Sequence, residues 1–395
     1  MFEKYEGLID LEEFLKKEYG YDKFDKKSMM KQPFISYEGS GSTAQFWITD
    51  KEGEQYLFKS SSDYKYATLY GELISKEVAK ILGINCADVR ACTFQGETGV
   101  LSKKITKQNE TIINGGQVIQ DVLNNYSLIN EGKAYLEEES FLTDDTFKEL
   151  YDIPENLKTL KESLMVKYIY NNLNNLDQLW SIIELYFKCH NRPAKERILV
   201  IDYLVKTFIF DVIMMQDDRH IENWGIIYNP DLNGLFPCPL YDNAGVLGLD
   251  HTDLNARIKR FNKEYESYIN YPTEAHEENF ANHLYDKNKR LLLTVSSSDI
   301  VNARRKTRKN NMKVLASFLD VTDSVYVDLL CDYVNKVANV DIIQMLKIVE
   351  NENGLIIPDN VKDYITKVWS SNLKLIKKTM NSYGLEVKDD CKRNS

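Results

Sequence analysis

The segment Met214–Gly225, MMQDDRHIENWG, brings several side chains capable of catalysis close together in sequence. Asp218, His220 and Asn223 follow one another at spacings of two and three residues. A carboxylate can orient a hydroxyl and accept its proton, and an imidazole can donate a hydrogen bond to a phosphoryl oxygen. An amide oxygen is a hard ligand of the kind that Mg²⁺ prefers. The pattern is typical of phosphoryl transfer, and the plainer alternative is a capped turn with a structural histidine.

Two strand-like runs follow this segment and flank a turn. Residues 224–228 are apolar and lead into the sequence NPDLNG at 229–234, which is dense in turn-forming residues. A second run, residues 235–240, leads into Asp242. If the two runs pair as a hairpin, its open end brings Asp242 beside Asn223. We therefore predict that this carboxylate and this amide oxygen bind Mg²⁺ beside the phosphates of a nucleotide.

The sequence D-R-H-x-x-N at 218–223, followed by P-L-Y-D-N at 239–243, resembles the catalytic and metal-binding segments of HipA-like kinases. It is more distantly similar to the catalytic loop of phosphoinositide kinases. The resemblance implies an α+β, bilobal protein-kinase-like fold with a small β-rich N-lobe and a larger, mainly helical C-lobe. It also implies ATP and Mg²⁺ as cofactors and phosphorylation of a protein serine or threonine. Asp218 would be the base, and His220 would face the γ-phosphate.

A glycine-containing segment near the N-terminus fits this expectation. Gly39, Gly41 and Ala44 are followed by the strand-like residues 45–49 and 55–59. A dinucleotide-binding fingerprint would require a helix after the glycines, whereas a glycine hairpin between strands suits a kinase loop that covers phosphates. An ordinary Gly-Ser turn is the alternative. The predicted phosphate-contacting residues are Gly39, Ser40, Gly41 and Ser42.

The serines of the glycine-containing segment are candidates for autophosphorylation. In that family a serine of this loop can be autophosphorylated as self-inhibition, and the resemblance extends the expectation to Ser40 or Ser42. Ala44 departs from the pattern because it replaces a third glycine, and Phe46 stands where a small β-branched residue usually covers the base.

Lys59 ends the second of these strands, where a kinase lysine reaches the α- and β-phosphates. The pattern of residues 67–82 predicts an amphipathic helix that stops at Gly83. Glu72, in the first turns of this helix, is the preferred partner of Lys59, and Glu77 is the competing candidate.

Two more strands, residues 84–94 and 98–105, would complete a five-stranded N-lobe. The second would run into a hinge between the lobes, whose backbone groups could bind adenine. Because Lys103 and Lys104 lie at the end of the second strand, this order of elements places them at the nucleotide site.

The composition limits the possible partners. The chain has 395 residues, a net charge of −10 and a pI near 5.3, so we predict no direct binding to nucleic acid. Its six cysteines show no C-x-x-C spacing, which favours reduced thiols. No run approaches the roughly 18 apolar residues of a membrane helix, and the acidic N-terminus does not resemble a signal peptide. We expect a cytoplasmic protein without a membrane partner.

The expected organisation is an N-terminal helical extension (1–33), an N-lobe (34–110), a C-lobe (111–385) with a catalytic hairpin (214–245), and a disordered tail (386–395). The leading hypothesis is an ATP- and Mg-dependent serine/threonine protein kinase. A toxin-like role and an inhibitory partner protein stay open. The alternatives are a phosphoinositide or small-molecule kinase and a catalytically silent nucleotide-binding regulator.

Overall fold

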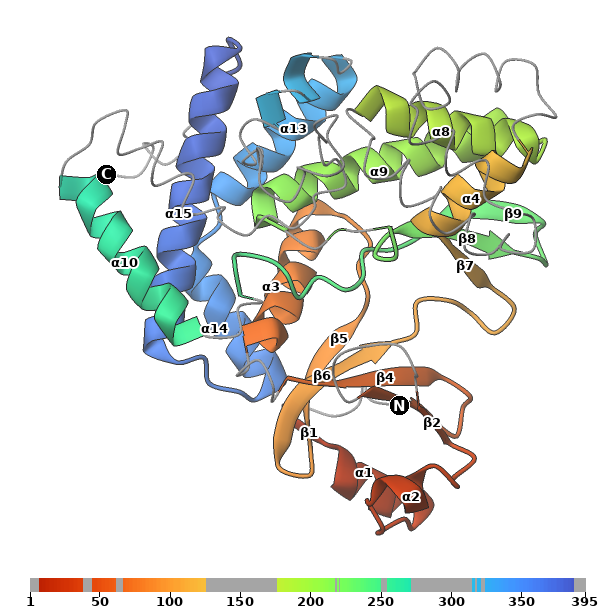
Figure 1. Ribbon diagram of the computed structural model, residues 1–395. Helices are drawn as coiled ribbons and strands as arrows, with labels where there is room; N and C mark the ends of the chain where they lie inside the picture. Colours follow the sequence, from red (N-terminus) through yellow and green to blue (C-terminus); the bar gives the residue numbers. More distant parts are fainter. Residues whose placement is uncertain are drawn as a thin grey trace, which may run out of the picture.

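The computed structural model in Figure 1 has a β-sheet at the N-terminal end of the chain and a larger, mainly helical part, with helix α3 between them. The structure describes residues 7–37, 45–61, 67–125, 176–216, 219, 221–249, 254–270, 315–316, 318–320 and 324–386. The predicted tail from residue 387 onward lies outside these ranges.

The N-terminal sheet has six strands in the spatial order β1-β5-β6-β4-β3-β2. They are β1 (Ile9–Asp10), β2 (Ile35–Tyr37), β3 (Gln45–Thr49), β4 (Gln55–Ser60), β5 (Val89–Phe94) and β6 (Glu97–Lys103). Neighbouring strands are antiparallel except for β1 and β5, which are parallel. The strands predicted at 45–49, 55–59, 84–94 and 98–105 are present as β3, β4, β5 and β6, although β5 begins only at Val89. Strand β2 is the strand expected before the glycine-containing segment. The additional strand β1 was missed because two residues are too few to show any periodicity.

Three helices belong to this half of the chain: α1 (Leu11–Tyr19), α2 (Lys26–Met29) and α3 (Ala67–Leu82). Helix α1 begins at Leu11 because the Asp10 carboxylate accepts hydrogen bonds from the backbone N–H groups of Glu12 and Glu13. It packs against β5, so the predicted N-terminal extension contributes to the core of the sheet. Helix α3 ends where Gly83 takes a left-handed conformation with φ +70°.

The alternation of side chains along β4 assigns the two faces of the sheet. Phe58 pairs with Leu101 of β6, and both lie in the apolar cluster that includes α1. Lys59, the next residue, pairs with Val100, which belongs to the core shared with α3. Lys59 therefore lies on the face of the sheet that α3 covers.

The C-terminal part is built around α9 (Ala194–Met214), which is buried along most of its second half. The surrounding helices are α4 (Gly115–Asn125), α8 (Leu176–Cys189), α10 (Leu254–Asn270), α13 (Ser324–Ala338), α14 (Ile342–Asn353) and α15 (Asp359–Ser382). Helices α13 and α14 also pack against α3, which fixes that helix to both parts of the molecule. None of the described helices is long and apolar enough to cross a membrane.

A second sheet has three strands, in the order β7-β8-β9. Strands β8 (Gly225–Asn229) and β9 (Gly234–Pro237) pair in an antiparallel manner, which confirms the predicted hairpin. Strand β7 (Thr111–Asn114) pairs with β8. The sequence did not reveal β7, because its four residues, TIIN, do not alternate between apolar and polar side chains.

Backbone hydrogen bonds join the two parts of the molecule near Asp242 in the chain. The Ala87 N–H donates to the Leu240 carbonyl at 2.7 Å, and the Leu240 N–H donates to the Asn85 carbonyl at 2.9 Å. Farther away, the side-chain oxygen of Asn353 accepts a hydrogen bond from the Ala91 N–H at 3.0 Å. The first two contacts attach the chain just before Asp242 to the connection between α3 and β5.

Candidate active site

Lys59 of β4 reaches across from the N-terminal sheet to Asp242, which follows β9. Its Nζ lies 2.9 Å from the Asp242 Oδ1. The two side chains are 29% and 36% exposed, so solvent has access to the pair. Ion pairs of this exposure contribute roughly 0–1 kcal/mol to stability. A ligand that binds either group can therefore replace this contact at little cost.

Asp242 has a left-handed backbone conformation, with φ +54°. A residue other than glycine pays about 1 kcal/mol or more for this conformation, so surrounding contacts must hold it. Arg219 Nη1 donates to the carbonyl of Tyr241 at 2.8 Å, and Gln216 Nε2 donates to the carbonyl of Asp242 at 3.3 Å. The predicted metal ligand is thus fixed through its main chain by residues of the 214–225 segment.

Arg219 lies at the centre of this arrangement and is fully buried, as is its partner Asp211 on α9. Its Nε and Nη2 lie 3.1 Å and 2.9 Å from the Asp211 carboxylate oxygens. Burial lowers the pKa of Arg219, but Asp211, together with Tyr241 and Asp242, raises it by more, so the net direction is upward. The guanidinium is therefore a permanent buried cation.

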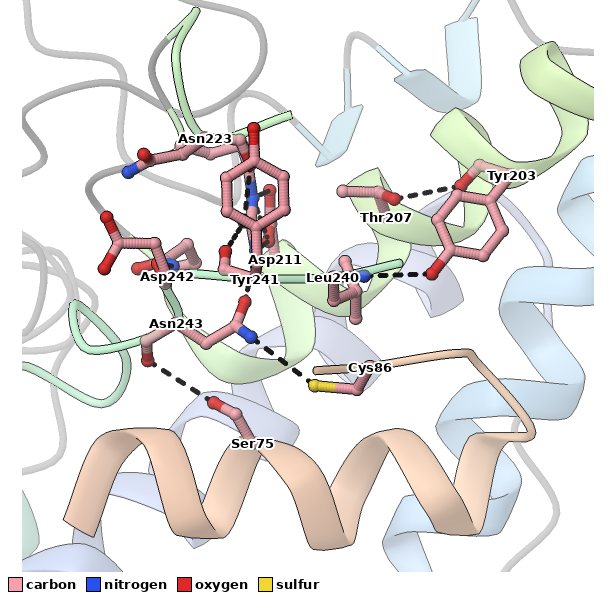
Figure 2. A network of polar contacts seen from close by, with 12 residues as sticks. Ser75, Cys86, Tyr203, Thr207, Asp211, Asn223, Leu240, Tyr241, Asp242 and Asn243 are labelled. Atoms are coloured by element: carbon pink, nitrogen blue, oxygen red, sulfur yellow. Dashed lines mark hydrogen bonds and ion pairs between the residues drawn. The ribbon is translucent and has the colours of Figure 1, made fainter. Parts of the chain in front are cut away.

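Asn223 enters the same network through its main chain, because Arg219 Nη1 donates to its carbonyl at 3.0 Å. The Asn223 residue is only 5% exposed. Figure 2 shows that the Asn223 amide and the Asp242 carboxylate extend to the same side of the cluster. The two predicted metal ligands thus lie on neighbouring segments that one guanidinium connects.

Helix α4 also holds the 214–225 segment through its backbone. Gly115 and Gly116, its first two residues, donate backbone hydrogen bonds to the carbonyls of Trp224 and Ile221 at 3.0 Å and 3.2 Å. A side chain at Gly115 would collide with the Trp224 indole. Close approach of the helix therefore requires glycine at this position.

Glu72 of α3 is buried against this cluster at 6% exposure. Burial raises the pKa of its carboxyl to about 7, although Lys59 and the backbone N–H of Asn243 favour the ionised form. Glu77, the other predicted partner of Lys59, instead lies 3.7 Å from Lys80. Of the two carboxylates, Glu72 is the one that interacts with Lys59.

Helix α3 approaches the segment after Asp242 closely. A Cβ placed on Gly71 would lie 2.6 Å from the backbone oxygen of Ala244. Figure 2 shows Asn243 above α3, with its carbonyl toward Ser75 and its amide toward Cys86. The glycine at the position before Glu72 therefore lets the helix set that carboxylate beside the predicted metal segment.

The remaining predicted site residues are placed as follows. Lys103 Nζ lies 3.1 Å from Glu54, and Lys104 Nζ lies 2.7 Å from the Gln55 side-chain oxygen. These contacts are at the start of β4, whereas Lys59 is near its end. Asp218, His220 and residues 39–42 lie outside the residues that the structure describes, between or beside segments that it does describe.

Sequence reasoning missed Asp211, Gln216, Arg219 and Asn243. One signal was present for the first of them, because Asp211 interrupts the apolar run FIFDVIMM near the end of α9. An aspartate is almost never fully buried without a partner, so its position implied a nearby cation. The sequence alone could not identify that cation as Arg219.

Comparisons with known proteins support the fold. No protein-family model matches the chain, and no curated protein matches it in sequence. Its structure is similar to that of the proinflammatory kinase CtkA of Helicobacter pylori, with a TM-score of 0.55 and 12% identity over 96% of this chain and 100% of that one. HipA from the HipA–HipB–operator DNA complex of Shewanella oneidensis MR-1 gives a TM-score of 0.45 and 12% identity, over 98% of this chain and 76% of that one.

The likeness to CtkA shows that the chain has a kinase-like, bilobal fold. The fold class predicted from the sequence is therefore confirmed, and with it the kinase-like fold that the resemblance to HipA-like kinases implied. At this level of identity, activity has to be argued from the site itself.

The contact at Gly71 gives a prediction about stability. We expect Gly71→Ala to destabilise the protein by about 1–3 kcal/mol, because the added methyl group meets backbone rather than a side chain that can move. Helix propensity alone would predict a gain of up to about 1 kcal/mol. Gly116→Ala is the matched control, since its added methyl group would meet only side-chain atoms, at 3.3 Å. Denaturant unfolding measures both variants, and a Gly71→Ala protein as stable as the wild type would contradict the prediction.

The raised pKa of Glu72 predicts a pH dependence of stability. An acid whose pKa rises from 4.5 to about 7 on folding binds its proton more tightly in the native state. Its contribution to stability is therefore full below about pH 4.5 and is lost as the pH rises to about 7. Relative to Glu72→Gln, the wild type should lose about 3 kcal/mol of unfolding free energy over this interval. Denaturant unfolding at several pH values tests this, and parallel pH profiles for the two proteins would refute it.

Proposed function

We propose that this chain is an ATP- and Mg-dependent phosphotransferase that acts on a serine or threonine hydroxyl of a protein. The observation that carries the proposal is the meeting of Lys59, Glu72 and Asp242 from three separate segments, with Lys59 Nζ 2.9 Å from Asp242 Oδ1. Asn223 belongs to the same cluster through Arg219. A lysine, its acidic partner, an amide and a second carboxylate are the groups that kinase-like folds use for nucleotide phosphates.

The donor set at the proposed metal position fits Mg²⁺. Asn223 and Asp242 offer oxygen ligands, and Mg²⁺ needs only one or two protein ligands because phosphates and water supply the rest. The Lys59 ammonium already contacts one oxygen of Asp242, so the position favours a cation. When bound, Mg²⁺ would neutralise charge on the nucleotide phosphates.

The proposed work of the protein is positioning and charge stabilisation. Lys59, released from Asp242, would bind phosphate oxygens, and Glu72 would keep its ammonium in place. Asp218 would accept the proton of the substrate hydroxyl, and His220 would donate a hydrogen bond to the transferring phosphoryl group. These roles require no covalent intermediate with the protein, in keeping with the chemistry of phosphoryl transfer. Gly39, Ser40, Gly41 and Ser42 are proposed to cover the phosphates.

The first test is transfer of label from γ-labelled ATP with Mg²⁺. We expect labelled protein bands with the wild type, in buffer or in a cell lysate, and their loss in both Asp218→Asn and Asp242→Asn. Asn372→Ala, altered at a buried side chain that contacts α9 backbone carbonyls, serves as a control for general damage. Label in a lipid or small molecule would favour a different kinase class. Nucleotide binding without transfer by the wild type would favour a silent regulator.

A second prediction concerns the metal without nucleotide. Because the Lys59 ammonium and a divalent cation compete for the Asp242 carboxylate, Lys59→Met should bind Mn²⁺ more tightly than the wild type. The expected gain is about fivefold, which corresponds to roughly 1 kcal/mol for a partly exposed ion pair. Titration of Mn²⁺ by electron paramagnetic resonance measures it, with Asp242→Asn as the variant that should lose the site. Equal or weaker binding by Lys59→Met would show that the lysine does not compete with the metal.

A further inference from the structure

We propose that Arg219 is a positioning residue that assembles the metal site by holding Asn223 and Asp242 in the relative positions that metal binding requires. The proposal rests on the phosphotransferase function proposed above. It assigns a role to the middle residue of D-R-H, which neither contacts the reacting groups nor acts as a ligand. Arg219 would act through the main chain of Asn223 and through Tyr241 and Asn243, the two neighbours of Asp242.

The bonding of the guanidinium supports this role, because each of its five N–H groups has an acceptor. Nε and one N–H of Nη2 bind Asp211, and the other N–H of Nη2 binds the side-chain oxygen of Asn243 at 2.7 Å. The two N–H groups of Nη1 bind the carbonyls of Asn223 and Tyr241 at 3.0 Å and 2.8 Å. One planar group thus joins α9, the 214–225 segment and both residues that flank Asp242.

No other side chain could make these contacts. Arginine offers five donors in a fixed plane, whereas lysine offers three donors around one atom. A lysine at this position would leave at least two of the acceptors without their donor. Since Arg219 is buried, water could not replace those donors without opening the cluster. The contact with Tyr241 would matter most, because it helps to hold the left-handed backbone of Asp242.

Asp211 makes a buried cation compatible with a neighbouring metal ion. An unpaired positive charge next to Asn223 and Asp242 would repel a divalent cation, and the effect would be large in a water-poor environment. The Asp211 carboxylate cancels this charge at hydrogen-bonding distance. The Asp211–Arg219 pair therefore supplies orientation without adding net charge to the metal site.

A purely structural role for the pair makes a different prediction from a positioning role. Loss of structural support would lower stability and weaken all binding to a similar extent. Loss of positioning would weaken the metal-dependent part of nucleotide binding in particular. Substitutions in the shell that orients metal ligands typically cost about 10- to 100-fold in metal affinity.

The test uses the full chain and compares wild type with Arg219→Lys. Mn²⁺ affinity is measured in the presence of saturating ADP, and ADP affinity is measured without metal. We expect Arg219→Lys to bind Mn²⁺ at least about tenfold more weakly, with the metal-free affinity for ADP within about twofold of the wild type, a margin of roughly 0.4 kcal/mol. Asn372→Ala is the matched control, because it also removes buried hydrogen bonds to α9 and should leave both affinities unchanged.

Asn243→Ala provides a second variant if Arg219→Lys does not fold. It removes one acceptor of Arg219 and leaves the Asp211–Arg219 pair intact. We expect a smaller loss of Mn²⁺ affinity, about threefold or more, or roughly 0.7 kcal/mol. Unchanged Mn²⁺ affinity in whichever variant folds would overturn the positioning role while leaving the proposed function intact. Failure of the wild type to bind Mn²⁺ with ADP would overturn both, and equal losses of metal-free and metal-dependent binding would show a merely structural role.

Discussion

The buried ion pair between Asp211 and Arg219 is the interaction on which the candidate site depends. Removing two charges from water is costly, and a buried pair is stable only if further hydrogen bonds satisfy both groups. Here the remaining N–H groups of Arg219 are satisfied by acceptors on the segments that carry Asn223 and Asp242. The need to satisfy one buried cation therefore ties α9 to both segments. Breaking the pair would leave a buried charge without a partner, so the arrangement is expected to be rigid.

A more adaptable group of charges lies beside this rigid centre. Lys59 and Asp242 are partly exposed, so their ion pair is weak and can be exchanged for contacts with a ligand. Glu72 is buried and its pKa is raised to about 7, so at neutral pH its protonated and ionised forms are similarly populated. When Glu72 is ionised, the three carboxylates of Asp211, Glu72 and Asp242 outnumber the two cations, Lys59 and Arg219. The cluster as a whole then favours the entry of another cation.

The two parts of the molecule contribute different groups to the cluster, and close backbone packing holds those groups together. Gly71 lets α3 approach the backbone of Ala244, and Gly115 lets α4 approach Trp224. The hydrogen bond between the Ala87 N–H and the Leu240 carbonyl fixes the segment that leads from β9 to Asp242. In each case a small residue or a backbone group makes the contact. The position of Glu72 therefore depends on the packing of the C-terminal helices as well as on the sheet that carries Lys59.

The sequence by itself determined the local features of this protein. Alternation, helical periodicity and turn residues predicted five strands of the sheet, helix α3 with its stop at Gly83, and the hairpin before Asp242, because these patterns depend on near neighbours in the chain. It also indicated which residue types could bind a nucleotide and a metal. Only the tertiary structure decided that Lys59 influences the pKa of Glu72 rather than that of Glu77, and that Arg219 pairs with Asp211. Those outcomes depend on long-range packing and on the burial of charge, which no local pattern records.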